Sequence, residues 1–247
     1  MAETSLRVEL NQTQVPQEAE TELSFRIVDA DGNAVTDYEI EHEREMHLIV
    51  VRRDLTGFQH LHPDMAEDGT WSTPITLSEG GSYRIFADFS HAGESLTLSA
   101  DLTVEGQGND RKLPPEASES ETRSGYKVRV EGATAQAGHP TELAFGITRD
   151  GEQVAVEPYL GANGHLVALR EADLEFLHVH PMDGEAHDHT TGHESRAGDD
   201  HVSQVAASSE EVRFMTEFPS AGRYRLFLQF KHDGDVHTAE FTRDVRQ

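Results

Sequence analysis

Histidines recur in this sequence at a spacing that can build a metal site. His47 precedes a His-x-His pair, His60 and His62, by 13 and 15 residues. If the chain on either side of a turn at 53–57 forms a hairpin, His47 lies opposite His62, and cross-strand partners project from one face of a sheet. His60 shares that face, because side chains alternate along a strand. Three neutral imidazoles on one face can bind Cu(II), Zn(II) or Ni(II), and Cu(II) ranks highest by intrinsic affinity.

The same triad occurs a second time, at His165, His178 and His180. The segments HLIVVRRDLTGFQHLHP (47–63) and HLVALREADLEFLHVHP (165–181) match at an offset of 118. TELSF also matches TELAF, and GSYRIFADFSHAG matches GRYRLFLQFKHDG at an offset of 141. The chain is therefore a tandem duplication with about 23 extra residues between the blocks of its second half.

Other side chains could complete or extend the two triads. Met46 could offer a thioether to Cu(I), although Gly164 stands at the matching position of the second half. His91 and His232 follow a Tyr-Arg-x-Phe segment in each half, and could supply a fourth nitrogen or be ordinary turn residues. The insertion at 187–201 could catch metal loosely or be a loop without a role. Its histidines are His187, His189, His193 and His201.

Alternation of apolar and polar residues with a period of two predicts strands throughout the chain, separated by turn signals such as Asp31-Gly32 and Asp68-Gly69. We expect two tandem antiparallel β-sandwiches, immunoglobulin-like or cupredoxin-like, over 4–106 and 124–246. The segment 107–123 is rich in Gly, Pro, Ser and Glu, which is typical of a flexible linker.

The apolar residues around the triad are expected to build the core of the first domain. We assign Leu48, Val50, Phe58 and Leu61 to this core, with or without a metal site. Three large aromatic residues are expected to be core and corner residues and not a platform for substrate: Trp71, Tyr83 and Tyr224.

The composition excludes several classes of function. The chain has 247 residues, with 46 acidic against 20 basic side chains and a formal net charge of −26. This charge argues against sequence-independent binding of nucleic acid or anionic lipid, and favours a cationic partner, a metal or a salt-rich setting. The chain has no cysteine, which excludes disulfides, thiolate metal sites, iron–sulfur clusters and cysteine nucleophiles.

Neither a membrane span nor a signal peptide is expected. The sequence has no run of 18 apolar residues, and its first residues lack the basic and apolar regions of a secretory signal. The chain is therefore either cytoplasmic or the mature form of an exported protein.

The HLHP and HVHP blocks resemble those of a family of bacterial exported proteins with tandem β-sandwiches, often encoded near heavy-metal-transporting ATPases. The resemblance covers nearly the whole chain apart from the linker and the insertion. More distantly, the halves are similar to YtkA-like domains and to periplasmic copper-resistance chaperones. This resemblance implies metal handling, an extracytoplasmic location and a metal acceptor such as a metal-transporting ATPase.

The favoured function is therefore metal buffering, delivery or resistance without catalysis, with copper as Cu(II) or Cu(I) first and zinc second. One alternative is a cupin-like metalloenzyme, because Glu67 and Glu185 follow the two His-x-His pairs after four intervening residues. The glycines and the later histidine motif of cupins are not at the expected positions. The other alternative is a structural immunoglobulin-like interaction module without metal.

Overall fold

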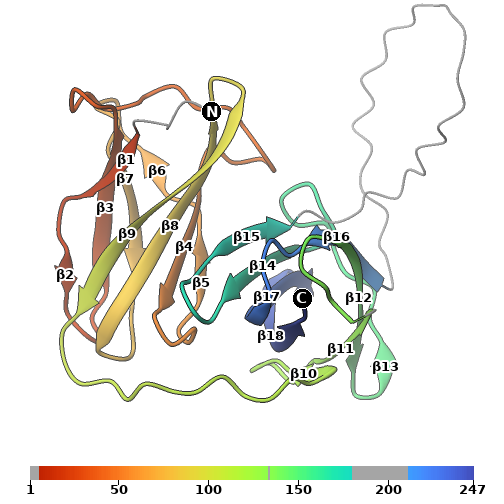
Figure 1. Ribbon diagram of the computed structural model, residues 1–247. Helices are drawn as coiled ribbons and strands as arrows, with labels where there is room; N and C mark the ends of the chain where they lie inside the picture. Colours follow the sequence, from red (N-terminus) through yellow and green to blue (C-terminus); the bar gives the residue numbers. More distant parts are fainter. Residues whose placement is uncertain (1–5, 133, 180–210) are drawn as a thin grey trace, which may run out of the picture. The chain divides into compact units, whose positions relative to one another are not determined.

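The computed structural model describes residues 6–132, 134–179 and 211–247, and within these ranges every regular element is a β-strand. The chain divides into two compact units, Met1–Leu113 and Pro114–Gln247. Each unit contains two sheets that pack face to face (Figure 1). The prediction of tandem antiparallel β-sandwiches is confirmed. None of the described segments is a helix with the length and apolarity that a membrane crossing requires.

The first unit has a four-stranded sheet of order β1-β3-β7-β6 and a five-stranded sheet of order β2-β9-β8-β4-β5. All neighbours are antiparallel except β2 and β9. The strands of this unit are β1 (Arg7–Leu10), β2 (Gln14–Val15), β3 (Thr21–Val28), β4 (His47–Arg52), β5 (Gln59–Leu61), β6 (Asp64–Met65), β7 (Trp71–Ile75), β8 (Gly81–His91) and β9 (Glu94–Val104).

The second unit repeats this plan. One sheet has the order β10-β11-β12-β13, with β16 also paired to β12, and the other has the order β15-β14-β17-β18. The strands are β10 (Glu119–Glu121), β11 (Lys127–Gly132), β12 (Pro140–Arg149), β13 (Glu152–Gln153), β14 (His165–Arg170), β15 (Phe176–Val179), β16 (Glu211–Glu217), β17 (Gly222–His232) and β18 (Asp235–Val245).

The core of the first unit forms where alternate residues of the two sheets meet. Leu48 and Val50 of β4 are fully buried in it together with Phe25 and Trp71 of the opposite sheet, and Leu61 packs against it. The predicted core positions of Leu48, Val50, Leu61 and Trp71 are confirmed. Since β4 buries Leu48 and Val50 on the core side, the alternation of the strand directs His47 to the opposite face of the sheet.

Both units have a buried tyrosine near the start of a long strand. The Tyr83 hydroxyl donates a hydrogen bond to the backbone oxygen of Glu79 at 2.9 Å, and the Tyr224 hydroxyl donates to that of Ser220 at 2.9 Å. This four-residue return is the tyrosine corner of immunoglobulin-like sandwiches. Burial is the largest effect on both phenols, and it raises the pKa of each above the ordinary value.

The segment predicted as a flexible linker, 107–123, contains more structure than its composition indicates. Its last part includes β10, which pairs with β11 in the second unit. Its first part is tied to the first unit by Arg52, which donates to the backbone oxygen of Asn109 and pairs with Asp110 at 3.2 Å. The strand was missed because Glu-Ser-Glu at 119–121 has no apolar alternation, and the contacts of Asn109 and Asp110 were missed because Arg52 lies far away in the sequence.

Candidate metal centre

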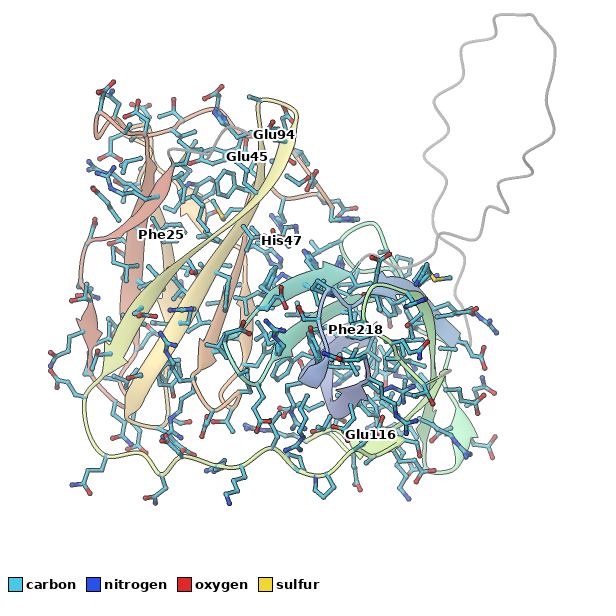
Figure 2. All side chains as sticks on the ribbon, in the orientation of Figure 1. Phe25, Glu45, His47, Glu94, Glu116 and Phe218 are labelled. Atoms are coloured by element: carbon cyan, nitrogen blue, oxygen red, sulfur yellow. The ribbon has the colours of Figure 1, made fainter. Side chains whose placement is uncertain are left out.

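The histidines of the first unit are positioned by the hairpin of β4 and β5. Leu48 pairs with Leu61 and Ile49 with His60, so the next step of the register sets His47 opposite His62. This is the predicted cross-strand arrangement, and it is confirmed. His47, labelled in Figure 2, begins β4 and is buried, whereas His60 and His62 are half-buried.

The three imidazoles converge on one point. One ligand atom from each of His47, His60 and His62 lies within 4.8 Å of the other two. The ring centroids are 5.3 Å apart for His47 and His60, 5.0 Å for His47 and His62, and 4.8 Å for His60 and His62. Two nitrogens on one tetrahedral ion with bonds of about 2.0–2.1 Å are separated by roughly 3.3 Å. His47 Nδ1 and His60 Nε2, 3.1 Å apart, are already close to that separation.

A backbone carbonyl determines which nitrogen of His47 faces the cluster. His47 Nε2 lies 3.2 Å from the backbone oxygen of Glu41. Because a carbonyl oxygen only accepts, Nε2 carries the proton and Nδ1 presents its lone pair toward His60. Histidines that bind metals commonly donate their second ring N–H in this way, which fixes the tautomer and the orientation of the ring.

That carbonyl belongs to a tight turn that occurs in both units. Glu41 and Arg44 exchange two backbone hydrogen bonds of 2.9 and 3.0 Å, and Tyr159 and Ala162 do so at 2.8 and 3.2 Å. Both central residues have positive φ, as in a type I′ turn. These angles are 49°, 63°, 52° and 73° at His42, Glu43, Leu160 and Gly161. The sequence did not predict this turn, because His-Glu lacks the usual Asn-Gly signal.

The second unit repeats the arrangement around its first two histidines. His165 is buried, and its Nε2 lies 2.9 Å from the backbone oxygen of Tyr159, as His47 Nε2 does from Glu41. Val167 pairs with His178, and the ring centroids of His165 and His178 are 6.0 Å apart. The third predicted ligand, His180, lies outside the described residues, as do the four histidines of the 187–201 insertion.

Three further candidate ligands lie elsewhere. Met46 is 1% exposed and packs in the hydrophobic core, away from the histidine face, so the structure does not bring its thioether to the cluster. His91 and His232 end β8 and β17, where their Nδ1 atoms contact the backbone oxygen of Asp37 and the hydroxyl of Tyr126. Both histidines fit the alternative that they are ordinary residues at the hairpin ends.

Two other expectations are changed by the register. Phe58 was expected in the core, but it is half-buried, does not belong to the core cluster and precedes β5 by one residue. Phe58 lies two residues before His60, so the alternation of side chains along the strand places it on the histidine face although it is hydrophobic.

Glu67, the carboxylate of the cupin alternative, is exposed in the turn between β6 and β7 and does not join the cluster. Its counterpart Glu185 is not described.

Two residues beside the cluster were missed by sequence reasoning. The ring of His42 lies 6.3 Å from that of His47, and Asp88 of β8 pairs with His47 across the sheet. Neither is repeated in the second half, where Leu160 and Gln229 occupy the matching positions. Repetition between the two halves therefore gives no signal for either residue. Only the pairing of β4 with β8 places Asp88 on this face.

Comparison with protein families adds a classification. The model of a domain of unknown function, DUF8832, matches residues 2–106 and 120–247. The chain belongs to this family. The DUF8832 match leaves out 107–119, most of the segment predicted as a linker. No curated protein matches the sequence.

Distant similarities to solved structures are also found. The Escherichia coli adhesin FdeC shows 16% identity and a TM-score of 0.31, covering 100% of this chain and 65% of that one. A Salmonella alpha-2-macroglobulin mutant shows 13% identity and a TM-score of 0.31, covering 98% of this chain and 15% of that one. Domains 4 and 5 of the S-layer protein SbsC show 10% identity and a TM-score of 0.28, covering 98% of both chains. Similarities at this level carry no argument about the function of the DUF8832 chain.

Proposed function

We propose that this protein binds transition-metal ions, copper in the first place and zinc in the second, and serves metal buffering, delivery or resistance without catalysis. The observation that supports this most is the convergence of His47, His60 and His62, with ligand atoms within 4.8 Å of one another. The repeated contact from Nε2 to a backbone carbonyl supports it further, because it fixes the ring and places the proton on Nε2 in both units, as in many histidines that bind metals.

The chemistry of the cluster fits borderline divalent ions. Imidazole nitrogens suit copper and zinc, and three of them leave a position open for water or for an acceptor. Because His47 Nδ1 presents its lone pair, the contact of 3.1 Å is a hydrogen bond that His60 donates from Nε2. With a metal ion between the two nitrogens, His60 would offer the Nε2 lone pair and would carry its ring proton on Nδ1 instead.

The role in the cell follows from the same proposal. Three protein ligands and an open position suit an ion that must be passed on to an acceptor, such as a metal-transporting ATPase. A net charge of −26 attracts cations to the surface. An extracytoplasmic location is proposed from the family resemblance of the HLHP and HVHP blocks.

Calorimetric titration of the metal-free protein with Cu(II) and with Zn(II) tests the proposal. The 187–201 insertion is deleted in all variants, so that its histidines do not contribute. We expect one tight equivalent from each unit, and the double variant His60→Ala with His62→Ala should lose one of them. Affinity for the remaining equivalent should stay within about twofold, because sites in separate units act independently.

The matched control is His91→Ala, which removes an imidazole of the same unit that lies outside the cluster. It should leave both equivalents in place. Undiminished binding in the double variant would refute the assignment of the ligands. The absence of any tight equivalent in the wild-type chain would leave the structural interaction module as the function, and turnover that depends on bound metal would favour the enzyme.

A further inference from the structure

The two histidine sites differ in the charge of the residue that pairs with the leading histidine. His47 pairs with Asp88 of β8, and His165 pairs with Gln229 of β17. Paired residues of antiparallel strands have Cβ atoms about 4.5–5.5 Å apart on the same face. Each leading histidine therefore has a cross-strand neighbour on the histidine face, which is a carboxylate in the first unit and an amide in the second.

The rest of this polar row is the same in both units. The Thr97 hydroxyl donates to Asp88 Oδ1 at 2.5 Å, and Gln229 Nε2 donates to the Thr238 hydroxyl at 3.4 Å. Thr97 and Thr238 are the next residues across the sheet, at Asp88↔Thr97 and Gln229↔Thr238. The threonine thus orients the neighbouring side chain in both units, and the charge of that side chain is what differs.

Basic residues on the same strand faces are already paired with other carboxylates. Arg84 of β8 pairs with Asp101 at 3.0 Å, as Arg53 does at 2.9 Å, and Arg225 of β17 pairs with Glu240. Lys231 lies two residues from Gln229 on the same face of β17 and pairs with Glu157 at 3.9 Å, and the first unit has Ser90 at the matching position. Each of these basic residues thus has a carboxylate partner other than Asp88. The carboxylate of Asp88 therefore adds one negative charge to the histidine face of the first unit, and nothing on β17 supplies the equivalent.

We propose that Asp88 makes the first site the tighter of the two and selects a divalent ion over monovalent copper. This inference rests on the proposed metal binding. A carboxylate beside the cluster stabilises a doubly charged ion more than a singly charged one. The chain has no cysteine and Met46 packs in the core, so among the described residues neither of these soft ligands favours Cu(I) on this face. Partners of this kind typically contribute about 10- to 100-fold to metal affinity.

The test compares one site at a time in the otherwise complete chain. The His165→Ala, His178→Ala background keeps the first site, and the His60→Ala, His62→Ala background keeps the second. Asp88→Asn in the first background should weaken Zn(II) binding at least about tenfold, while Ag(I), a monovalent probe without redox chemistry, should lose much less. Gln229→Asp in the second background should strengthen Zn(II) binding, and this gain does not depend on how well Asp88→Asn folds.

The matched control is Glu94→Gln, which removes one exposed negative charge from the hairpin that carries Asp88. It should leave Zn(II) affinity within about twofold, because exposed charges are screened. Equal losses in Asp88→Asn and Glu94→Gln, or equal losses of Zn(II) and Ag(I), would overturn the inference. Unchanged Zn(II) affinity in both Asp88→Asn and Gln229→Asp would also overturn the inference. This result would not contradict the metal site itself. No binding in the first background would instead refute the metal site itself.

Discussion

Asp54 shows how a single carboxylate stabilises the turn between the two strands of the histidine hairpin. Its side chain is 5% exposed and pairs with the buried Arg52 at 3.0 Å. Burial is the largest effect and raises the pKa of Asp54. The hydrogen bonds from Thr56 and from the backbone N–H of Arg111, with the charge of Arg52, together outweigh it, so the pKa lies below its ordinary value of 3.8.

A lowered pKa in the folded state makes the stability depend on pH. The contribution of Asp54 is fully present above pH 3.8 and is lost as the pH falls through the lower folded-state value. We expect Asp54→Asn to lower the free energy of unfolding at pH 7 by about 1–3 kcal/mol, because Arg52 stays buried with one partner fewer. Below the folded pKa of Asp54, the variant and the wild type should converge.

Urea denaturation at pH values from 7 to 3 measures both effects. Asp110→Asn is the matched control, since Asp110 pairs with the same guanidinium but is 92% exposed. It should change the stability little at any pH, as exposed ion pairs do. A stability gap between Asp54→Asn and the wild type that stays constant down to pH 3 would contradict the assigned cause of the pKa shift.

At the scale of elements, the long hairpins β8–β9 and β17–β18 are anchored by the tyrosine corners. The hydroxyls of Tyr83 and Tyr224 each donate to a backbone oxygen four residues earlier at 2.9 Å, and both side chains are at most 1% exposed. Since β8 pairs with β4, and β17 with β14, the corners also hold the strands that carry His47 and His165.

We expect Tyr83→Phe and Tyr224→Phe each to destabilise its own unit by about 1 kcal/mol, because each leaves a carbonyl without its donor. For domains of this size the melting temperature should fall by roughly 4–6 °C. Differential scanning calorimetry measures the transitions of both units. A pair of variants that melt like the wild type would show that the two hydroxyls do not stabilise the corners.

At the scale of the whole molecule, acidic side chains exceed basic ones by 46 − 20 = 26. Many arginines of the described segments are already paired, such as Arg26 with Asp68 and Arg213 with Glu142. The surplus carboxylates therefore repel one another, and this repulsion opposes the compact state. Added salt shortens the screening length from about 10 Å at 0.1 M to about 3 Å at 1 M.

The melting temperature should therefore rise with NaCl up to molar concentrations, and KCl should act in the same way. Thermal scans from about 0.05 to 2 M salt, at fixed pH and with chelator present, measure the effect over the range in which screening changes most. A larger rise with millimolar calcium would reveal a site formed by carboxylates. A melting temperature that stays flat or falls with NaCl would show that the carboxylates are paired or spaced well enough to cause little repulsion.

Local pattern alone determined most of the fold and the centre of the site. The duplication, the all-β class and the hairpin that sets His47 opposite His62 follow from residue spacing, because the alternation of a strand and the length of a turn are local properties. The same alternation places Phe58 on the histidine face, although its hydrophobicity alone indicates the core.

Only the tertiary structure decided which residues from distant strands join or leave the site. Met46 neighbours His47 in sequence but packs in the core, and Arg52 binds Asn109 and Asp110 of a distant segment with linker-like composition. Asp88 lies opposite His47 through the pairing of β4 with β8, two strands about 40 residues apart. The physical reason is that strand order and long-range register depend on how whole sheets bury their apolar faces, which no short window of sequence contains.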